Sequence, residues 1–428
     1  MEPKKNYALP IVMMFALFFM IAFVTNLQSP LGVIVKEQFA LDTFRSQWGT
    51  FANFLAYACM GIPAGAMLRR YGYRRTALTA VVVGFAGVGV TLLSGRGEGS
   101  FPLYLAGAFV SGFSMCMLNT VVNPMLNTLG GGGRRGNQLI QFGGVCNSVG
   151  GTLAPVLGGY LMGNAVGGRV ISTADPVFFL AMGIFALTFL VLFRARIPES
   201  FVVNEPRRGE RTGALSFRHF RLGVAAIFVY VGVEVGIPSI ANFYMTGTGA
   251  GALNMDTAVA GTIVGTYWFL MLVGRLAGGL LGGRVSSRPM LAATASLGLV
   301  LVVLGMYLSP ETGVRMPVFR GGTSLSFGME TVPVGLMCFV LCGLCTSVMW
   351  GAIFNLAVEG LGKYTPMASG IFMTMVVGGG VLPALQGWIA DMTDYATSYW
   401  LIFGCLLYIL YYALAGSRNV DRTAPAAE

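Results

Sequence analysis

GGTLAPVLGGYL, at residues 150–161, returns in the second half of the chain as GGGVLPALQGWI, at residues 378–389. The two copies share their first two glycines, a proline, a leucine and a later glycine at matching positions. Both copies lie inside long apolar segments. Two related membrane-embedded halves are typical of secondary transporters, whose substrate sites lie between the halves near the bilayer midplane. The repeat therefore predicts a duplicated membrane fold.

The composition predicts that lipid surrounds most of the chain. Hydrophobic residues make up 55% of the 428 residues and charged residues only 10%, whereas soluble proteins carry about 25% charged residues. Apolar runs long enough to cross about 30 Å of hydrocarbon follow one another along the sequence. They predict twelve transmembrane helices at residues 10–33, 47–68, 77–95, 101–128, 138–164, 176–193, 222–246, 260–282, 289–308, 333–357, 367–390 and 397–416. We therefore expect an all-α membrane protein with two pseudo-symmetric six-helix bundles.

The net charge of +10 indicates membrane topology rather than nucleic-acid binding. Arginines crowd the loops on one side of the predicted bundle, which is the positive-inside pattern with both termini in the cytoplasm. The long connection on that side, residues 194–221, separates an N-terminal bundle at 1–193 from a C-terminal bundle at 222–428, which ends in a short cytoplasmic tail. The only histidine of the chain, His219, lies in this connection, and we expect it to be solvated.

A second, fainter repeat lies at the cytoplasmic ends of two predicted helices. GAMLRRYGYRR, at residues 65–75, follows the second span, and AGGLLGGRVSSR, at residues 277–288, follows the eighth. Small residues let helix ends approach closely, and arginines then hold the cytoplasmic loop. The expected cytoplasmic gate consists of Arg69, Arg70, Arg74, Arg75 and Arg275.

Polar side chains inside the predicted spans are candidate binding groups, because uncompensated polar groups are costly in hydrocarbon. Asn119, Asn123 and Asn127 follow at four-residue intervals and therefore share one helix face. An amide both donates and accepts hydrogen bonds, so this face suits a neutral polyhydroxylated ligand. Hydrogen bonding between helices explains it equally well. Asn127 lies closest to the cytoplasm, and we expect it to serve packing.

Glu234 is the only carboxylate placed well inside a predicted span. Tyr230, Glu234, Pro238 and Asn242 follow at four-residue intervals, and Pro238 lacks the N–H that would bond the carbonyl of Glu234. Locally opened helices of this kind build substrate and cation sites in transporters. Glu234 is therefore the candidate for proton acceptance or cation coordination. The alternative is a structural glutamate that bonds another helix.

Other amides and aromatic rings in the spans complete the candidate pocket. Pro30 frees the backbone carbonyl of Asn26 in the first span. Amides would bond sugar hydroxyl groups while aromatic rings stack on apolar C–H faces, although ordinary packing is the simpler explanation for any single ring. The candidate substrate-binding residues are Asn26, Gln28, Asn119, Asn123, Gln141, Asn147, Asn242, Tyr267, Trp268, Asn355, Gln386 and Trp388.

Five segments carry a resemblance to known proteins: FVTNLQSPLGVIVKEQF (23–39), LNTVVNPMLNTLG (118–130), CNSVGGTLAP (146–155), YVGVEVGIPSIANFY (230–244) and NLAVEGLGKYT (355–365). Together they resemble the fucose–galactose–glucose:proton symporters of the major facilitator superfamily. The resemblance extends from the first span to the eleventh. It implies the major facilitator fold and uptake of a hexose or related sugar across a bacterial inner membrane by alternating access.

The sequence departs from this family at two acidic positions. Family members typically have an acid in the first span and another in the fourth, where this chain has Ser29 and Asn119. The resemblance therefore does not support a proton route through these two positions, and Glu234 stays the coupling candidate. Asn147 matches a substrate-facing position of the family, whereas the glutamine expected three residues earlier is replaced by Gly144. Such changes are compatible with an altered substrate, such as an amino sugar.

The sequence thus predicts a secondary active transporter that imports a monosaccharide, either a hexose or an amino sugar, together with H⁺ or Na⁺. The alternatives are an uncoupled sugar facilitator and a transporter-like sugar sensor. We expect no enzymatic activity, no cofactor and no nucleic-acid partner. The seven cysteines lie in apolar spans without a further ligand cluster, so we expect neither a metal site nor disulfides. The expected partners are the sugar, the ion and the lipid bilayer of a bacterial inner membrane, around a monomer.

Overall fold

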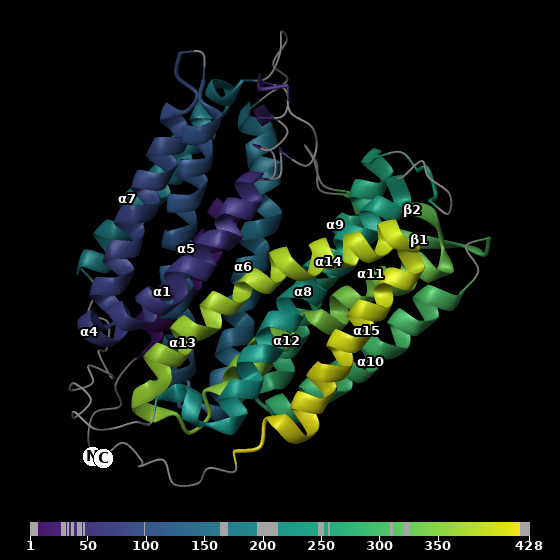
Figure 1. The fold of residues 1–428 in the computed structure, drawn as a ribbon. Helices are drawn as coiled ribbons and strands as arrows, with labels where there is room; N and C mark the ends of the chain where they lie inside the picture. The colour runs from purple at the N-terminus through teal and green to yellow at the C-terminus, as the bar shows by residue number, and fades with distance from the viewer. Residues whose placement is uncertain are drawn as a thin grey trace.

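The structure is a computed structural model, and it describes residues 7–26, 31, 34, 35, 38–40, 45, 48–97, 99–162, 170–194, 213–246, 252–255, 257–308, 311–320 and 326–419. These residues are almost entirely helical (Figure 1). The first group of helices comprises α1 (Ala8–Asn26), α4 (Trp48–Leu93), α5 (Phe101–Leu129), α6 (Gly133–Met162) and α7 (Asp175–Arg194). The second group comprises α8 (Arg218–Thr246), α9 (Thr257–Gly282), α10 (Ser287–Tyr307), α11 (Val334–Thr346), α12 (Met349–Ala357), α13 (Thr365–Thr374), α14 (Gly378–Met392) and α15 (Tyr395–Tyr411).

The predicted spans coincide with these helices. Within the described part of the chain, ten helical segments are long and apolar enough to cross a membrane. One of them, α4, contains two predicted spans, because Gly72 leaves the helical conformation at φ 77° and ψ 178°, which glycine adopts without the penalty that a Cβ brings. The more polar α6 accounts for the span predicted at 138–164. The all-α, two-bundle fold class is confirmed, whereas the domain boundaries at 194–221 stay a prediction, because residues 195–212 lie outside the described part.

The two ends of the helical bundle differ in their turns. One end, called here the basic end, carries the turns at Gly72, at residues 130–132 and at residues 283–286, with arginines beside each turn. The opposite end carries an antiparallel hairpin of β1 (Gly313–Arg320) and β2 (Ser326–Pro333), in which Gly313 pairs with Pro333. We call it the hairpin end. The backbone N–H of Phe319 donates to the hydroxyl of Thr266 at 2.8 Å, so the hairpin lies against α9.

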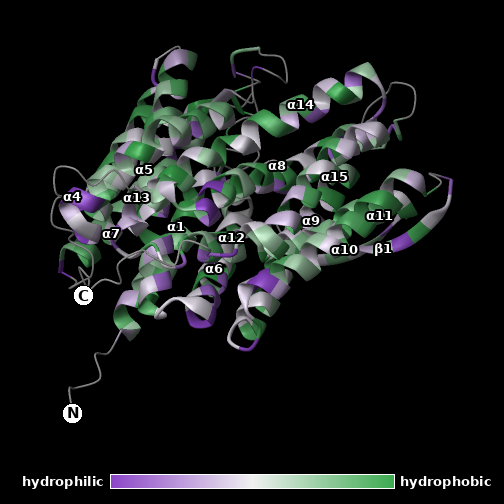
Figure 2. Cartoon of the chain, turned by 60° about the horizontal axis from the view of Figure 1, so that its bottom comes forward, coloured by the Kyte–Doolittle hydropathy of each residue, from purple (hydrophilic) through white to green (hydrophobic). Residues whose placement is uncertain are grey.

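The outer faces of the helices are apolar. Large hydrophobic side chains are exposed along most spans, such as Val12 on α1 (61%), Leu187 on α7 (64%), Leu280 on α9 (63%) and Val300 on α10 (55%). Figure 2 shows hydrophobic residues over the flanks of both groups of helices, with hydrophilic residues gathered toward helix ends and loops. Lipid, rather than water, is the solvent that such flanks fit.

The two halves meet between the middle of the bundle and the basic end. Figure 1 shows α13 reaching across to the N-terminal half, where it packs on α4. Gly370 of α13 lies against Gly61 and Gly65 of α4, and the hydroxyl of Ser369 donates to the carbonyl of Thr120 on α5 at 3.0 Å. A second seam joins α6 to α9. The candidate site lies at the edge of this second seam that is farther from the basic end.

Candidate functional site

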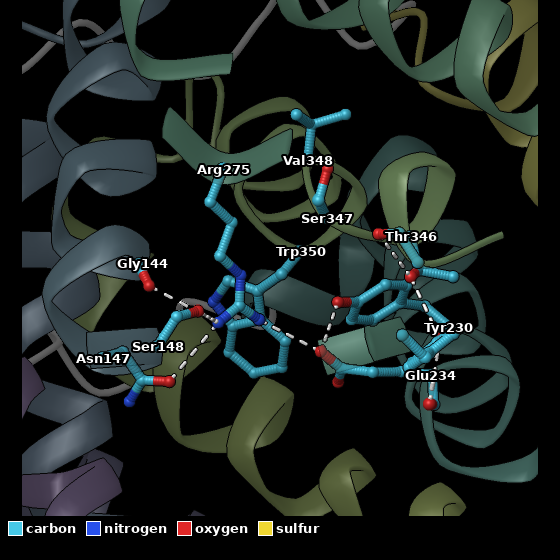
Figure 3. Close-up of polar contacts among 12 residues, drawn as sticks. Gly144, Asn147, Ser148, Tyr230, Glu234, Arg275, Thr346, Ser347, Val348 and Trp350 are labelled. Atoms are coloured by element: carbon cyan, nitrogen blue, oxygen red, sulfur yellow. Dashed lines mark hydrogen bonds and ion pairs between the residues drawn. The ribbon is translucent and has the colours of Figure 1, made fainter. Parts of the chain in front are cut away.

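An ion pair between α8 and α9 lies at the centre of the site. Nη2 of Arg275 lies 3.0 Å from Oε1 of Glu234, and the two side chains are 13% and 15% exposed. Burying ions is costly, and a buried pair persists where further hydrogen bonds satisfy both partners. Both residues make such bonds (Figure 3). Removing one partner alone would cost about 3–5 kcal/mol, because the other charge would stay buried and unpaired.

The guanidinium of Arg275 also crosses to the N-terminal half. Its Nη1 donates to Oγ of Ser148 at 2.8 Å, and it lies 3.4 Å from the carbonyl oxygen of Gly144 and 3.5 Å from Oδ1 of Asn147. All three residues belong to α6, and Figure 3 shows Arg275 between this helix and Glu234. Gly144 leaves room for the arginine, since a Cβ there would lie 3.2 Å from Cδ of Arg275.

This position corrects the sequence-based grouping of Arg275 with the four arginines of α4. Arg275 lies two turns before the end of α9 at Gly282, which corresponds to about 10 Å of helix. Its contacts are with Glu234 and α6 rather than with Arg69, Arg70, Arg74 and Arg75. The sequence repeat aligned the two arginine-rich segments but could not show that the last turns of α9 are buried against another helix.

Two tyrosines hold Glu234 in place. The hydroxyl of Tyr230, one turn earlier on α8, donates to Oε1 of Glu234 at 2.9 Å. Because Pro238 has no N–H, the backbone carbonyl of Glu234 lacks its usual helical partner. It accepts instead from the hydroxyl of Tyr267 on α9 at 3.1 Å. Tyr267 is 1% exposed. It therefore supports the backbone of the site through this hydrogen bond.

The amides of α5 lie on the N-terminal side of the site. Asn119 donates to the hydroxyl of Tyr57 at 2.9 Å and stays partly exposed. Asn123 is fully buried; it donates to the backbone of Asn119, and its Oδ1 accepts from the indole N–H of Trp350 on α12 at 3.1 Å. Asn123 thus bonds across the halves. Asn127 lies against Gly136 at the turn into α6, which agrees with a packing role.

The two predicted residues of α6 have different surroundings. Gln141 is buried, and its Nε2 donates to the carbonyl of Val348, between α11 and α12, at 2.9 Å. Gln141 therefore ties the seam between the halves. Asn147 is partly exposed and donates to the carbonyl of Phe18 on α1 at 3.1 Å, while its Oδ1 faces Arg275. Of the two, Asn147 is the one brought to the ion pair.

Three predicted residues of the C-terminal half are not brought to the ion pair. Asn355 is buried near the basic end and donates to the hydroxyl of Ser287 at 2.9 Å. Gln386 is fully buried on α14 and faces Gly236 of α8, where a Cβ would lie 2.6 Å from its Oε1. Trp388, two residues further along α14, is 59% exposed. The structure therefore does not bring these three candidate substrate-binding residues together at one site.

The remaining predicted residues that the structure describes lie on α1, α8 and α9. Asn26 is exposed at the end of α1, donates to the carbonyl of Ala22 at 2.8 Å and lies beside Gly151 of α6. Asn242 is partly buried on α8, one turn beyond Pro238. Trp268 is 40% exposed and meets the ring of Tyr267 edge-on. Gln28 lies outside the described residues.

The basic end holds the other predicted arginines. Arg74 donates to the backbone carbonyls of Leu192, at 3.3 Å, and of Phe193, and so covers the end of α7 in its own half. Arg69, Arg70 and Arg75 lie beside the Gly72 turn, and Arg70 lies over the ring of Tyr71. His219 was expected to be solvated and is instead fully buried, with Nε2 2.9 Å from the carbonyl of Glu359. The ring of Phe217, whose centroid lies 6.0 Å away, and the turn after α12 at Glu359 cover the imidazole, which explains the difference.

Sequence reasoning missed Ser148 and Trp350 as members of the site. Ser148 is one hydroxyl in a glycine-rich stretch without polar periodicity, so no local signal distinguished it. Trp350 lies five residues before Asn355, and nothing in the sequence distinguishes it from the other aromatic residues of the spans. Tyr230 was detectable, because it lies four residues before Glu234 on the same helix face.

Comparisons with known proteins agree with this architecture. The family model described as Major Facilitator Superfamily matches residues 13–319. A glucose/galactose transporter of Brucella abortus is 30% identical over 424 residues, which cover 97% of this chain and 96% of the relative. An L-fucose-proton symporter of Escherichia coli is 24% identical over 415 residues, which cover 91% of this chain and 88% of the relative.

The fold is likewise shared with solved structures. The crystal structure of FucP in the outward conformation has a TM-score of 0.79 and 21% sequence identity, and the match covers 95% of this chain and 98% of that chain. The match to the family model spans more than half of the chain. Proteins of this superfamily are transporters rather than enzymes. The chain therefore belongs to the major facilitator superfamily, in the group that contains the glucose/galactose transporters and the L-fucose–proton symporters.

Proposed function

We propose that this protein imports a monosaccharide, a hexose or an amino sugar, by alternating access and couples the import to H⁺ or Na⁺. The observation that carries the proposal is the ion pair of Glu234 and Arg275 at the seam between the halves, surrounded by partly exposed amide and hydroxyl groups. Relatives matched over 96% and 88% of their own length are named glucose/galactose transporter and L-fucose-proton symporter. Secondary transporters place substrate and ion sites between such halves.

The proposed sugar contacts come from both halves. Asn119 and Asn147 offer amides from the N-terminal half, where each is only partly exposed. From the C-terminal half, Arg275 faces Asn147, and Trp350 bonds Asn123, which lies one turn from Asn119. Amides and a guanidinium bond hydroxyl groups in directional pairs, while an indole ring covers the apolar face of a sugar. Asn26, Asn242 and Trp268 stay proposed contacts at the edge of this region, and Gln28 stays a contact proposed from the sequence alone.

Glu234 is the proposed coupling group. Acidic side chains within membrane spans are rare and expensive, and they mark ion pathways in transporters. In the proton-coupled form, Glu234 takes a proton from water on the hairpin side together with sugar and releases it into the cytoplasm. The basic end is the proposed cytoplasmic side, because arginines concentrate there. The proposed location is a bacterial inner membrane, with the chain acting as a monomer.

Uptake into proteoliposomes tests this proposal. The reconstituted protein is given labelled glucose, galactose or glucosamine under an imposed H⁺ gradient, an imposed Na⁺ gradient, or neither. We expect accumulation above equilibrium under one of the two gradients. Glu234→Gln should lose this accumulation but keep sugar exchange, whereas Asp391→Asn, which changes an exposed carboxylate of α14, should behave as the unaltered protein.

Each contrary result has a defined meaning. Uptake that never exceeds equilibration under either gradient identifies an uncoupled facilitator. Specific sugar binding without any uptake identifies a sensor. Full accumulation by Glu234→Gln rules out the coupling role of Glu234 while leaving sugar transport intact.

A further inference from the structure

We infer that Arg275 is a positioning residue that links the charge on Glu234 to the closure of the seam between α6 and α9. The inference rests on the proposed function in its proton-coupled form and deepens it. It names the group through which a proton on one half alters the contact with the other half. Two independent features support it: the divided contacts of the guanidinium and the packing of the seam below it.

The two ends of the guanidinium serve different halves of the protein. Nη2 bonds Glu234 of its own half at 3.0 Å, and Nη1 bonds Ser148 of the opposite half at 2.8 Å (Figure 3). The planar fork of an arginine can hold two acceptors at fixed angles, which a lysine ammonium cannot reproduce. A change at Glu234 therefore reaches α6 through a single rigid group.

The seam below Arg275 is closed by tight packing toward the basic end. Gly279 of α9 lies against the ring of Phe142, and Gly282 lies against the backbone of Gln138. The amide of Gln141 crosses to the carbonyl of Val348 at 2.9 Å. Arg275 thus lies at the edge of this closed interface that is farther from the basic end. Its side chain is only 13% exposed to solvent while the seam is closed.

Protonation of Glu234 changes the electrostatic balance at this edge. With Glu234 ionised, the pair is neutral overall and each charge has a partner. With Glu234 protonated, the arginine charge faces only neutral acceptors, and an uncompensated charge in a poorly solvated interior is costly. Opening the seam exposes Arg275 to water and removes this cost. Protonation should therefore favour opening toward the cytoplasm, and release of the proton there should favour closure.

The neighbouring titratable groups leave Glu234 as the responding acid. Tyr230 on α8 and Tyr267 on α9 both bond Glu234 and act as hydrogen-bond donors. Tyr399 of α15 bonds the carbonyl of Ile237 on α8 at 2.9 Å. Gly343 of α11 lies against Tyr267, and the neighbouring thiols of Cys342 and Cys345 are buried. The groups packed on α8 from α12 and α14, Trp350 and Gln386, do not titrate. Among the described residues, Arg275 is the only cation in contact with Glu234.

The width of the seam can be measured directly as a function of pH. Arg135 and Arg284 are exposed at the basic ends of α6 and α9, so cysteines placed there carry a pair of spin labels across the seam. The full chain is used with Cys59→Ser and Cys146→Ala. Double electron–electron resonance then gives the distance distribution. We expect the longer-distance population to grow as pH falls, with a change of about tenfold in the ratio of open to closed forms, a size typical of linked equilibria.

Three variants separate the parts of the inference. Glu234→Gln should shift the ratio of open to closed forms toward the open form by the same amount at every pH, because the arginine charge is then never compensated, while the closed form stays populated enough for sugar exchange. Adding Arg275→Gln to Glu234→Gln should restore the closed form, because no unpaired charge is left. Arg275→Lys should keep a pH response but close less completely. Arg288→Gln, which removes a guanidinium bonded to Ser417 within the C-terminal half, is the matched control and should match the unaltered protein.

The inference fails if Glu234→Gln stays closed at every pH, or if the double variant opens as far as Glu234→Gln alone. It also fails if Na⁺ shifts the distances at fixed pH while protons do not. The proposed sugar transport fails on a separate measurement, the absence of sugar uptake by the unaltered protein. If the seam responds to pH in a protein that takes up no sugar, the proposed substrate is wrong, whereas the proposed link between Glu234 and the seam still holds.

Discussion

Gly370 of α13 packs against Gly65 of α4 with no side chain between the two backbones. A Cβ placed on Gly370 would lie 2.7 Å from Cα of Gly65 and 2.5 Å from the carbonyl oxygen of Gly61. Beside it, the hydroxyl of Ser369 donates to the carbonyl of Thr120 at 3.0 Å. Small residues permit such close helix approach in membranes. The contact joins the two halves, so it stabilises the arrangement in which they meet at the basic end.

Replacing Gly370 should therefore change the conformational equilibrium more than the stability of either half. Gly370→Val places a branched side chain against the backbone of α4, and the halves should separate at the basic end while each half stays folded. Spin labels at the exposed residues Arg135 and Arg284 should show a longer distance. Gly370→Ala should give a smaller shift in the same direction.

Gly404 offers the matched control for this substitution. It lies on α15, and a Cβ there would meet nothing within 4 Å. Gly404→Val should therefore leave the distance distribution unchanged. An unchanged distribution in Gly370→Val, with a normal melting temperature, would show that the glycine contact does not hold the halves together.

The helices and the acidic residue of the site were predictable from the sequence, because both follow from patterns of neighbouring residues. Long apolar runs defined the spans, and the four-residue spacing of Tyr230, Glu234 and Pro238 placed three groups on one helix face. The structure adds the partner of each group. The freed carbonyl of Glu234 bonds Tyr267, which the sequence had assigned to the substrate instead.

The partner of the acid was not predictable, because it depends on the packing of distant helices. Arg275 lies near an arginine-rich loop in the sequence, and only the contact of α9 with α6 shows that it bonds Ser148 and Glu234. The predicted position of Gln386 and Trp388 beside one pocket was not supported, for a different reason. Both are candidate binding residues of one predicted span, but residues two apart on a helix point about 200° apart, and neither lies beside the ion pair.

Gln386 should be replaceable by an apolar residue with a gain in stability. Its side chain is fully buried, and both amide atoms lack a hydrogen-bond partner among the described residues. A buried polar group without a partner costs about 1–3 kcal/mol. Gln386→Leu should therefore raise the melting temperature in detergent. Gln141→Leu, which removes the bond to Val348, should lower it. A lower melting temperature for Gln386→Leu would show that its amide has a stabilising partner.

Asp394 should contribute a pH-dependent term to the stability of α15. It precedes the helix and accepts from the backbone N–H and the hydroxyl of Thr397, at 2.8 and 2.6 Å. Several hydrogen bonds hold the pKa of this carboxyl below its ordinary value, and the one from the Thr397 side chain is the largest cause. Because the folded pKa is depressed, the stabilisation is present above the ordinary pKa, about 4, and is lost as pH falls through the folded value.

The measurement for Asp394 compares two proteins at two pH values. Asp394→Ala should lower stability at pH 7 by about 1 kcal/mol, the usual size of a helix cap. The difference in melting temperature between this variant and the unaltered protein should narrow in acid. A constant difference across this range would mean that the carboxylate charge contributes nothing to the cap.

Trp350 should report sugar binding through its fluorescence, because its indole joins the halves beside the proposed sugar contacts. The ring N–H donates to Oδ1 of Asn123 at 3.1 Å, and the ring centroid lies 6.2 Å from that of Tyr230. A sugar that bonds the amides of α5 would change the polarity around this ring. Trp350→Phe keeps an aromatic ring but removes the N–H, so it should weaken sugar binding and abolish most of the sugar-induced change in emission. Trp400→Phe, on an exposed position of α15, should preserve both. A full emission change in Trp350→Phe would place the bound sugar away from this indole.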